Sequence, residues 1–178
     1  MERIYKILPK YAFISHYIFA FYLNSITLFL EAEYFTTGMH HYDISIAIDR
    51  MLPFVTPMVS VYVLAYVTWI LGFIIIGRES KKLCYEVCSA EMIAKLICLV
   101  CFIIMPTTLT RPEITGTGFW NWLTSLIYST DAADNLFPSI HCLESWILFR
   151  GVMRCEKQGT TMKIFMFVSA ILVLHLQY

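Results

Sequence analysis

Two short segments of this chain carry residue types that suit phosphate chemistry. Arg111 stands before Pro112, and a polar stretch runs from Asp131 to His141 and ends in the residues Pro138-Ser-Ile-His. A guanidinium can bind two phosphate oxygens at once, and it keeps its proton. A helix that begins at Pro138 directs free backbone N–H groups and the positive end of its dipole at an anion in front of it. We therefore predict one anion site built from these two segments.

Each side chain of the polar stretch has an expected role. Ser139 adds a hydroxyl donor, and His141, in the first helical turn, can act as a general acid for a leaving alkoxide. Asp131 or Asn135 can close the turn by bonding backbone amides. Taken singly, an Arg at a helix end is more often an interfacial residue, and a His there is more often a cap or a surface residue. Because Arg111 and His141 are expected on one side, their combination favours a site.

Composition indicates an integral membrane protein. Hydrophobic residues make up 58% of the chain and charged residues 15%, and the mean hydropathy is +0.66. The net charge of zero argues against nucleic acid as a partner. We predict a single membrane domain over residues 1–178, an all-α polytopic bundle of about five spans. The expected spans are residues 11–30, 54–76, 92–109, 142–152 with extensions at both ends, and 164–176.

Loop charges predict the orientation of these spans, because Lys and Arg accumulate on the cytoplasmic side. The N-terminus is basic, residues 31–50 are mainly acidic, and the next connection holds Arg78, Lys81 and Lys82, with Lys95 at the foot of the third span. Arg111 is the one Lys or Arg of residues 106–141, and the connection after that is basic again. We therefore expect a cytoplasmic N-terminus, an anion site on the other face, and residence in the plasma membrane.

The two segments also resemble a known family. Thr-Leu-Thr-Arg-Pro at 108–112, followed by Asp131, Asn135 and Pro-Ser-Ile-His-Cys at 138–142, is similar to the first two signature motifs of the type 2 phosphatidic acid phosphatase superfamily, in particular its inositol phosphorylceramide synthase-like branch. Upstream, Asp-Arg-Met-Leu-Pro-Phe at 49–54, with Tyr62, Tyr66 and Trp69, resembles the second-span entry of bacterial members. The resemblance covers residues 49–154.

The resemblance implies a six-helix membrane fold whose site faces away from the cytoplasm. It also implies hydrolysis or transfer of a lipid-linked phosphate without a metal ion or cofactor. In that reaction Arg111 holds the phosphate, Ser139 and the adjacent amides stabilise its oxygens, and His141 protonates the leaving group. Pro112, Asp131, Asn135 and Pro138 are expected to support these residues.

Two departures from the family pattern bear on activity. A Lys that the family often has seven residues before the Arg is replaced by Ile104. The family's nucleophile is a second His in a third motif, and His175, the one His after His141, lacks that motif's Arg and Asp. Without an in-line nucleophile a phosphohistidine cannot form. We therefore expect a C-terminally truncated homologue, inactive at this length, unless a partner chain supplies the motif.

Other interpretations carry less weight. His40 and His41 with Asp43 offer metal-ligand types, but adjacent side chains diverge on a helix or strand. Cys98-Leu-Val-Cys101 lies in an apolar run, so the six cysteines are expected to be small hydrophobic residues. A non-catalytic lipid-phosphate-binding or scaffold protein is the main alternative function. A small transporter ranks last, since Asn24, Ser60 and Lys95 form no polar path.

Overall fold

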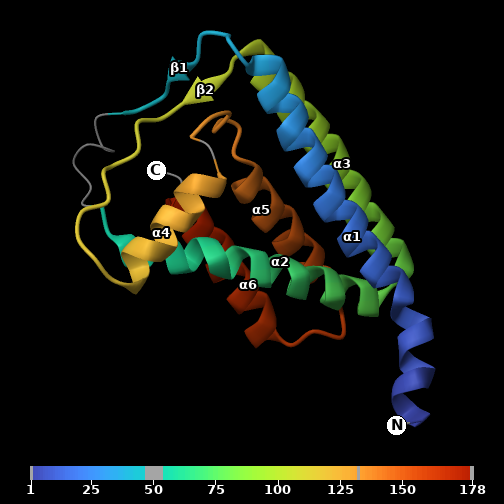
Figure 1. Cartoon of the computed structure of the whole chain (residues 1–178). Coiled ribbons are helices and arrows are strands. Elements are labelled where there is room, and N and C mark those ends of the chain that lie inside the picture. The colour runs from blue at the N-terminus through green and yellow to red at the C-terminus, as the bar shows by residue number, and fades with distance from the viewer. Residues whose placement is uncertain (1, 47–53, 132, 177–178) are drawn as a thin grey trace.

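The computed structural model describes residues 2–46, 54–131 and 133–176 (Figure 1). This part of the chain is all-α, with seven helices and two strands of two residues each. In chain order the elements are α1 (Glu2–Thr36), β1 (Tyr42–Asp43), the 3-10 helix η1 (Thr56–Met58), α2 (Val59–Glu79), α3 (Lys81–Ile104), β2 (Thr107–Thr108), α4 (Phe119–Thr130), α5 (Ile140–Met153) and α6 (Thr160–Leu176).

A single residue, Ser80, separates α2 from α3. Its backbone is extended, and its hydroxyl accepts a hydrogen bond from the N–H of Leu83 at 3.0 Å. This is the geometry of a serine N-cap, which satisfies one of the orphan donors at the start of a helix. The chain therefore turns back sharply, and α3 begins well before its apolar run does.

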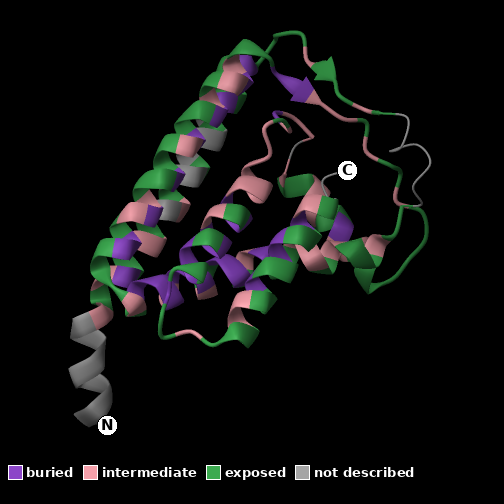
Figure 2. Cartoon of the chain, turned by 180° about the vertical axis from the view of Figure 1, so that it is seen from behind, coloured by how far each residue is buried: buried purple, intermediate pink, exposed green. Residues whose placement is uncertain are grey.

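The main core lies where α2 packs against α3, α5 and α6. Its buried residues include Phe73 and Ile76 from α2, Leu148 from α5 and Met166 from α6. Gly151 permits the close approach of α5, because a Cβ there would lie 2.6 Å from Cδ1 of Ile76. Figure 2 shows buried residues concentrated along α2 and α5, whereas α1 and α3 carry wide exposed faces.

The four connections gather at two ends of the helix bundle. β1 pairs in parallel with β2, with Tyr42 opposite Thr107, so the first and third connections lie together (Figure 1). At the other end, Arg154 lies 2.7 Å from Glu86, and so the basic connection after α5 contacts the start of α3. The orientation expected from the loop charges stays a prediction.

The expectation of five spans is wrong. Within the described residues, two helices are long and apolar enough to cross a membrane, Thr56–Glu79 and Lys81–Ile104. α5 has 14 residues, which give it a length of about 21 Å, short of the roughly 30 Å of a bilayer core. The boundaries of the third expected span, 92–109, are also wrong. Its helix starts at Lys81 because Ser80 caps it, and it ends at Ile104, before Pro106.

α4 was not predicted; it lies in the connection between Arg111 and His141 that we expected to lack a span. Gly118, with φ of +142°, takes the N-cap position, and the helix then exposes Phe119, Trp120 and Trp122. Its one buried residue, Thr124, donates a hydrogen bond of 2.8 Å to the carbonyl of Trp120 in the preceding turn. This short helix places Asp131 at its C-cap, next to the predicted site.

Candidate functional site

The Arg111 side chain packs against the end of α4. Its guanidinium lies over the ring of Tyr128, with Cζ 4.4 Å from the ring centroid. Its Nη1 donates to the carbonyl oxygens of Asp131 and Tyr128, and its Nη2 lies 3.9 Å from Oδ2 of Asp131. About 22% of the Arg111 side chain is exposed, so the guanidinium is held by protein groups while remaining open to solvent on one side.

Asp131 connects this arginine to α2. The Tyr62 hydroxyl donates a hydrogen bond of 2.9 Å to Oδ2 of Asp131, and it lies 3.1 Å from Nε2 of His141. The Tyr66 hydroxyl lies 3.1 Å from that of Tyr62 and 3.4 Å from the same imidazole nitrogen. The two sequence-predicted residues, Arg111 and His141, are thus joined through Asp131 and Tyr62. We call Arg111, Asp131, Tyr62, Tyr66 and His141 the polar network.

His141 is in the first turn of α5, as predicted. Its ring lies against those of Tyr62, Tyr66 and Trp69, with centroid separations of 4.8, 6.0 and 5.4 Å. Trp69 is itself fixed by a hydrogen bond of 2.9 Å to Ser145, one turn further along α5. Burial among these rings lowers the pKa of His141 below its ordinary value, and the nearby Asp131 carboxylate acts in the opposite direction. The imidazole is therefore neutral at pH 7.

The start of α5 differs in detail from the prediction. Ser139 is the N-cap, and its hydroxyl accepts a hydrogen bond of 3.3 Å from the N–H of Cys142. Pro138 therefore precedes the cap and is not the first helical residue, because serine is strongly favoured at the cap itself. The Ser139 hydroxyl can still donate its own hydrogen to an anion.

Three predicted supporting residues have other positions or partners than expected. Asn135 has a positive φ of 55°, its N–H donates to the carbonyl of Thr107, and its amide group donates to Thr36 at the end of α1. Within the described residues, the side chain of Asp131 accepts a hydrogen bond from Tyr62. Pro112 is exposed. Asn135 thus joins the end of α1 and β2 to the segment before α5.

The structure describes only part of the upstream segment that resembles the family. Residues 49–53 of the expected second-span entry lie outside the described residues. Tyr62, Tyr66 and Trp69, in contrast, lie on the face of α2 that contacts His141. These three aromatic residues belong to the family resemblance, but no role at the site was predicted for them. Their spacing of four and three residues is the signal that places them on one helix face.

The alternative metal and thiol sites remain unsupported by the geometry. His40 and Asp43 are exposed, and Nδ1 of the partly buried His41 lies 3.1 Å from the carbonyl oxygen of Met39. In the described part of the chain, no group of three His, Cys, Asp or Glu side chains is placed to hold a metal ion. The six cysteines are free thiols, and Cys84, Cys98 and Cys155 are buried.

Lys95 does not lie where we expected it, among the cytoplasmic loop charges at the foot of a span. Lys95 is in the middle of α3 with its side chain 2% exposed, and its Nζ lies 2.6 Å from Oε1 of Glu144 on α5. Glu91, one turn earlier on α3, is also buried. A buried ion pair between two apolar helices leaves little trace in a sequence, because the two partners are far apart along the chain.

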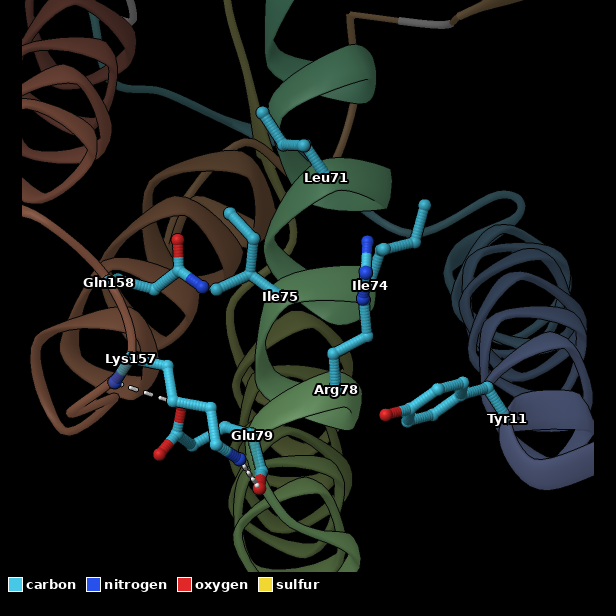
Figure 3. A pocket seen from close by; sticks show the side chains of 8 residues that line it. All are labelled: Tyr11, Leu71, Ile74, Ile75, Arg78, Glu79, Lys157 and Gln158. Carbon is cyan, nitrogen blue, oxygen red and sulfur yellow. Dashed lines mark hydrogen bonds between the residues drawn. The ribbon is translucent and has the colours of Figure 1, made fainter. Parts of the chain in front are cut away.

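A cavity of about 560 Å³ lies at the opposite end of α2 from the polar network. Figure 3 shows Arg78 and Tyr11 on one side of it, and Glu79, Lys157 and Gln158 on the other. Lys157 Nζ donates a hydrogen bond of 3.0 Å to the carbonyl of Glu79, so the connection after α5 is fastened to the end of α2. Arg111, Ser139 and His141 do not line this cavity.

No protein-family model matches the chain, and neither a curated protein nor a solved structure is similar to it. The resemblance to the type 2 phosphatidic acid phosphatase superfamily therefore stays a prediction.

The geometry allows two chemical operations at the polar network. A guanidinium and the N-terminus of α5, both near Asp131 and Tyr62, can neutralise a phosphate monoester. A neutral imidazole that takes up a proton when a dianion binds can return that proton to a leaving oxygen.

Proposed function

We propose that this chain is a membrane-embedded homologue of lipid phosphate phosphatases and phosphotransferases, and that its polar network binds the phosphate of a lipid headgroup. In this proposal Arg111 holds the phosphate, Ser139 and the first amides of α5 donate to its oxygens, and His141 protonates the leaving group. The observation that supports it best is a set of hydrogen bonds that runs from Arg111 to the main-chain carbonyl of Asp131, and from the Asp131 carboxylate through the Tyr62 hydroxyl to His141.

Exposed apolar surface supports a membrane location. In the apolar windows of the two candidate spans, Thr56–Glu79 and Lys81–Ile104, 39% and 28% of the residues are buried inside the protein. Each helix also has exposed apolar side chains, among them Val67 on α2 and Ile93 and Ile97 on α3. Apolar surface of this extent on a folded chain fits contact with lipid. With the bilayer as solvent, the Arg111 end of the bundle is the non-cytoplasmic face, because the basic connections lie at the other end.

The binding test uses the full chain in nanodiscs with a short-chain phosphatidic acid, and with inorganic phosphate as a second ligand. Arg111→Ala is expected to weaken binding of the lipid phosphate by about thirtyfold or more, since a charge-assisted bidentate contact is lost. Arg150→Ala, which removes an exposed arginine near the other end of α5, is the matched control and is expected to bind as the parent does. Unchanged affinity in Arg111→Ala would refute the site.

Turnover of a lipid phosphate distinguishes an enzyme from the non-catalytic alternative. Vanadate-sensitive release of phosphate from the lipid, lost in His141→Ala, would establish an enzyme. Binding without release would support a lipid-phosphate-binding protein, because the rings around His141 supply no second histidine as nucleophile.

A further inference from the structure

Three charged side chains meet in the interior between α3 and α5. Glu91, Lys95 and Glu144 are 1%, 2% and 2% exposed. Nζ of Lys95 lies 2.6 Å from Oε1 of Glu144 and 3.9 Å from Oε2 of Glu91. Lys95 therefore makes a hydrogen-bonded ion pair with Glu144, whereas Glu91 is beyond hydrogen-bond distance of it.

The Glu91–Lys95–Glu144 cluster carries one carboxyl group more than it has cations. Both oxygens of Glu91 are buried without a hydrogen-bond partner. An ionised carboxylate in such a place is strongly unfavourable, because it has lost its water and gains little from a cation already bonded elsewhere. A neutral carboxylic acid in the same place costs much less.

Among the side chains that the structure describes, the titratable groups that interact with the cluster bring no second positive charge. They include Tyr22 on α1, Tyr66 on α2, Cys88 and Cys98 on α3, and His141 on α5. Tyrosine and cysteine side chains are uncharged in their protonated form, and His141 is neutral at pH 7. Among the residues that the structure describes, no set of three ligands is placed for a metal ion either.

We infer that the Glu91–Lys95–Glu144 cluster is a proton-binding site in the apolar interior, and that Glu91 holds the proton at neutral pH. One proton passes from water to a Glu91 oxygen, and the cluster becomes electrically neutral with the Lys95–Glu144 ion pair intact. This inference stands independently of phosphate binding at the polar network. It follows from burial, charge and distance alone.

Counting charges gives the number of protonated carboxyl groups expected in the parent and in each variant. The parent holds one, and Glu91→Gln holds none. Lys95→Met removes the cation, so both Glu91 and Glu144 take up protons. Glu144→Gln holds none, because Glu91 releases its proton to become the partner of Lys95.

The experiment is infrared spectroscopy of the full chain in nanodiscs at pH 7, with exchange into D2O to identify the carboxylic acid C=O band. We expect this band to disappear in Glu91→Gln and in Glu144→Gln, and to double in Lys95→Met. If Lys95→Met does not fold, the double variant Lys95→Met with Glu144→Gln contains no buried ion pair and is expected to show one band. Glu86→Gln, on the exposed surface of the same helix, is the matched control and leaves the band unchanged.

A band that persists unchanged in Glu91→Gln would overturn the inference. The inference would also be overturned if the parent lacked the band and gained it when Na⁺ and K⁺ were replaced by a bulky organic cation. That result would mean that a bound metal ion, and not a proton, neutralises the cluster. Neither readout involves phosphate, so this inference and the proposed function fail separately.

Discussion

The Tyr62 hydroxyl lies 3.1 Å from Nε2 of His141, although the two residues are 79 positions apart in the chain. The same hydroxyl donates to the Asp131 carboxylate at 2.9 Å. One side chain of α2 thus fixes both the loop that carries Asp131 and the first turn of α5. The catalytic geometry that we propose depends on this α2 contact as much as on the loop itself.

Replacing Tyr62 by Phe is therefore expected to destabilise the fold. Asp131 loses its donor and His141 loses a partner, and each loss in a partly buried site costs about 1 kcal/mol. We expect the free energy of unfolding to fall by roughly 1–2 kcal/mol, measured by denaturant titration in detergent. Tyr34→Phe, at a 78% exposed position on α1, is the control and is expected to show no change. Equal stability of the two variants would contradict the hydrogen-bonded path.

The stability of the protein is expected to depend on pH through His141. Because burial lowers its pKa in the folded state, the unfolded chain binds a proton more readily. The free energy of unfolding is thus expected to fall as the pH drops below about 6.5, the ordinary histidine value, and to level off once the folded state is protonated too. Thermal unfolding between pH 7.5 and 5 measures this.

His141→Gln should remove that pH dependence, while His40→Gln, at an exposed position in the first connection, should retain it. If the free energy of unfolding of His141→Gln still fell with decreasing pH, another titrating group would be responsible.

The residues of the site were predictable, but their neighbours were only partly so. Arg111, Ser139 and His141 stand in compact motifs, and local rules place a histidine in the first turn after a serine cap. Asp131 was expected to close a turn, yet it accepts from Tyr62. That contact depends on how α2 packs against the end of α4, and local sequence rules do not contain this information.

The predicted helix lengths were wrong for a similar reason. We read spans from runs of apolar residues, so the charged first two turns of α3 were assigned to a loop. Ser80 caps those turns, and Lys82 and Glu86 support them as an i,i+4 pair on the surface. α5 was extended to bilayer length in the prediction, although it ends at Met153.

Asp131→Asn is expected to strengthen phosphate binding at the polar network. The Asp131 carboxylate lies 3.9 Å from the Arg111 guanidinium, and it repels an anion that approaches the same cation. Removing one negative charge at this distance in a partly exposed site is worth about a three- to thirtyfold gain in affinity. Isothermal titration with short-chain phosphatidic acid measures it, and Glu113→Gln, at an exposed position two residues from Arg111, is the control. Weaker binding in Asp131→Asn would indicate that Asp131 acts mainly by positioning Arg111.

The two ends of the bundle are expected to face opposite sides of a membrane. The pairing of β1 with β2 joins the first and third connections, and the Arg154–Glu86 ion pair joins the second and fourth. A cysteine at Thr117, an exposed position before α4, should then react with a membrane-impermeant maleimide from one side of sealed vesicles. A cysteine at Gly159, where an added Cβ meets no atom within 4 Å, should react from the other side.

The unmodified chain gives the background of its six native thiols, and permeabilised vesicles give the full signal for both variants. Since basic residues accumulate in the cytoplasm, position 159 should be labelled from the cytoplasmic face and position 117 from the opposite one. Labelling of both positions from the same face would mean that α2 and α3 do not cross the bilayer. In that case the exposed apolar surfaces of these helices would have to be covered by protein. The site around Arg111 could then no longer be assigned to the non-cytoplasmic face of a membrane.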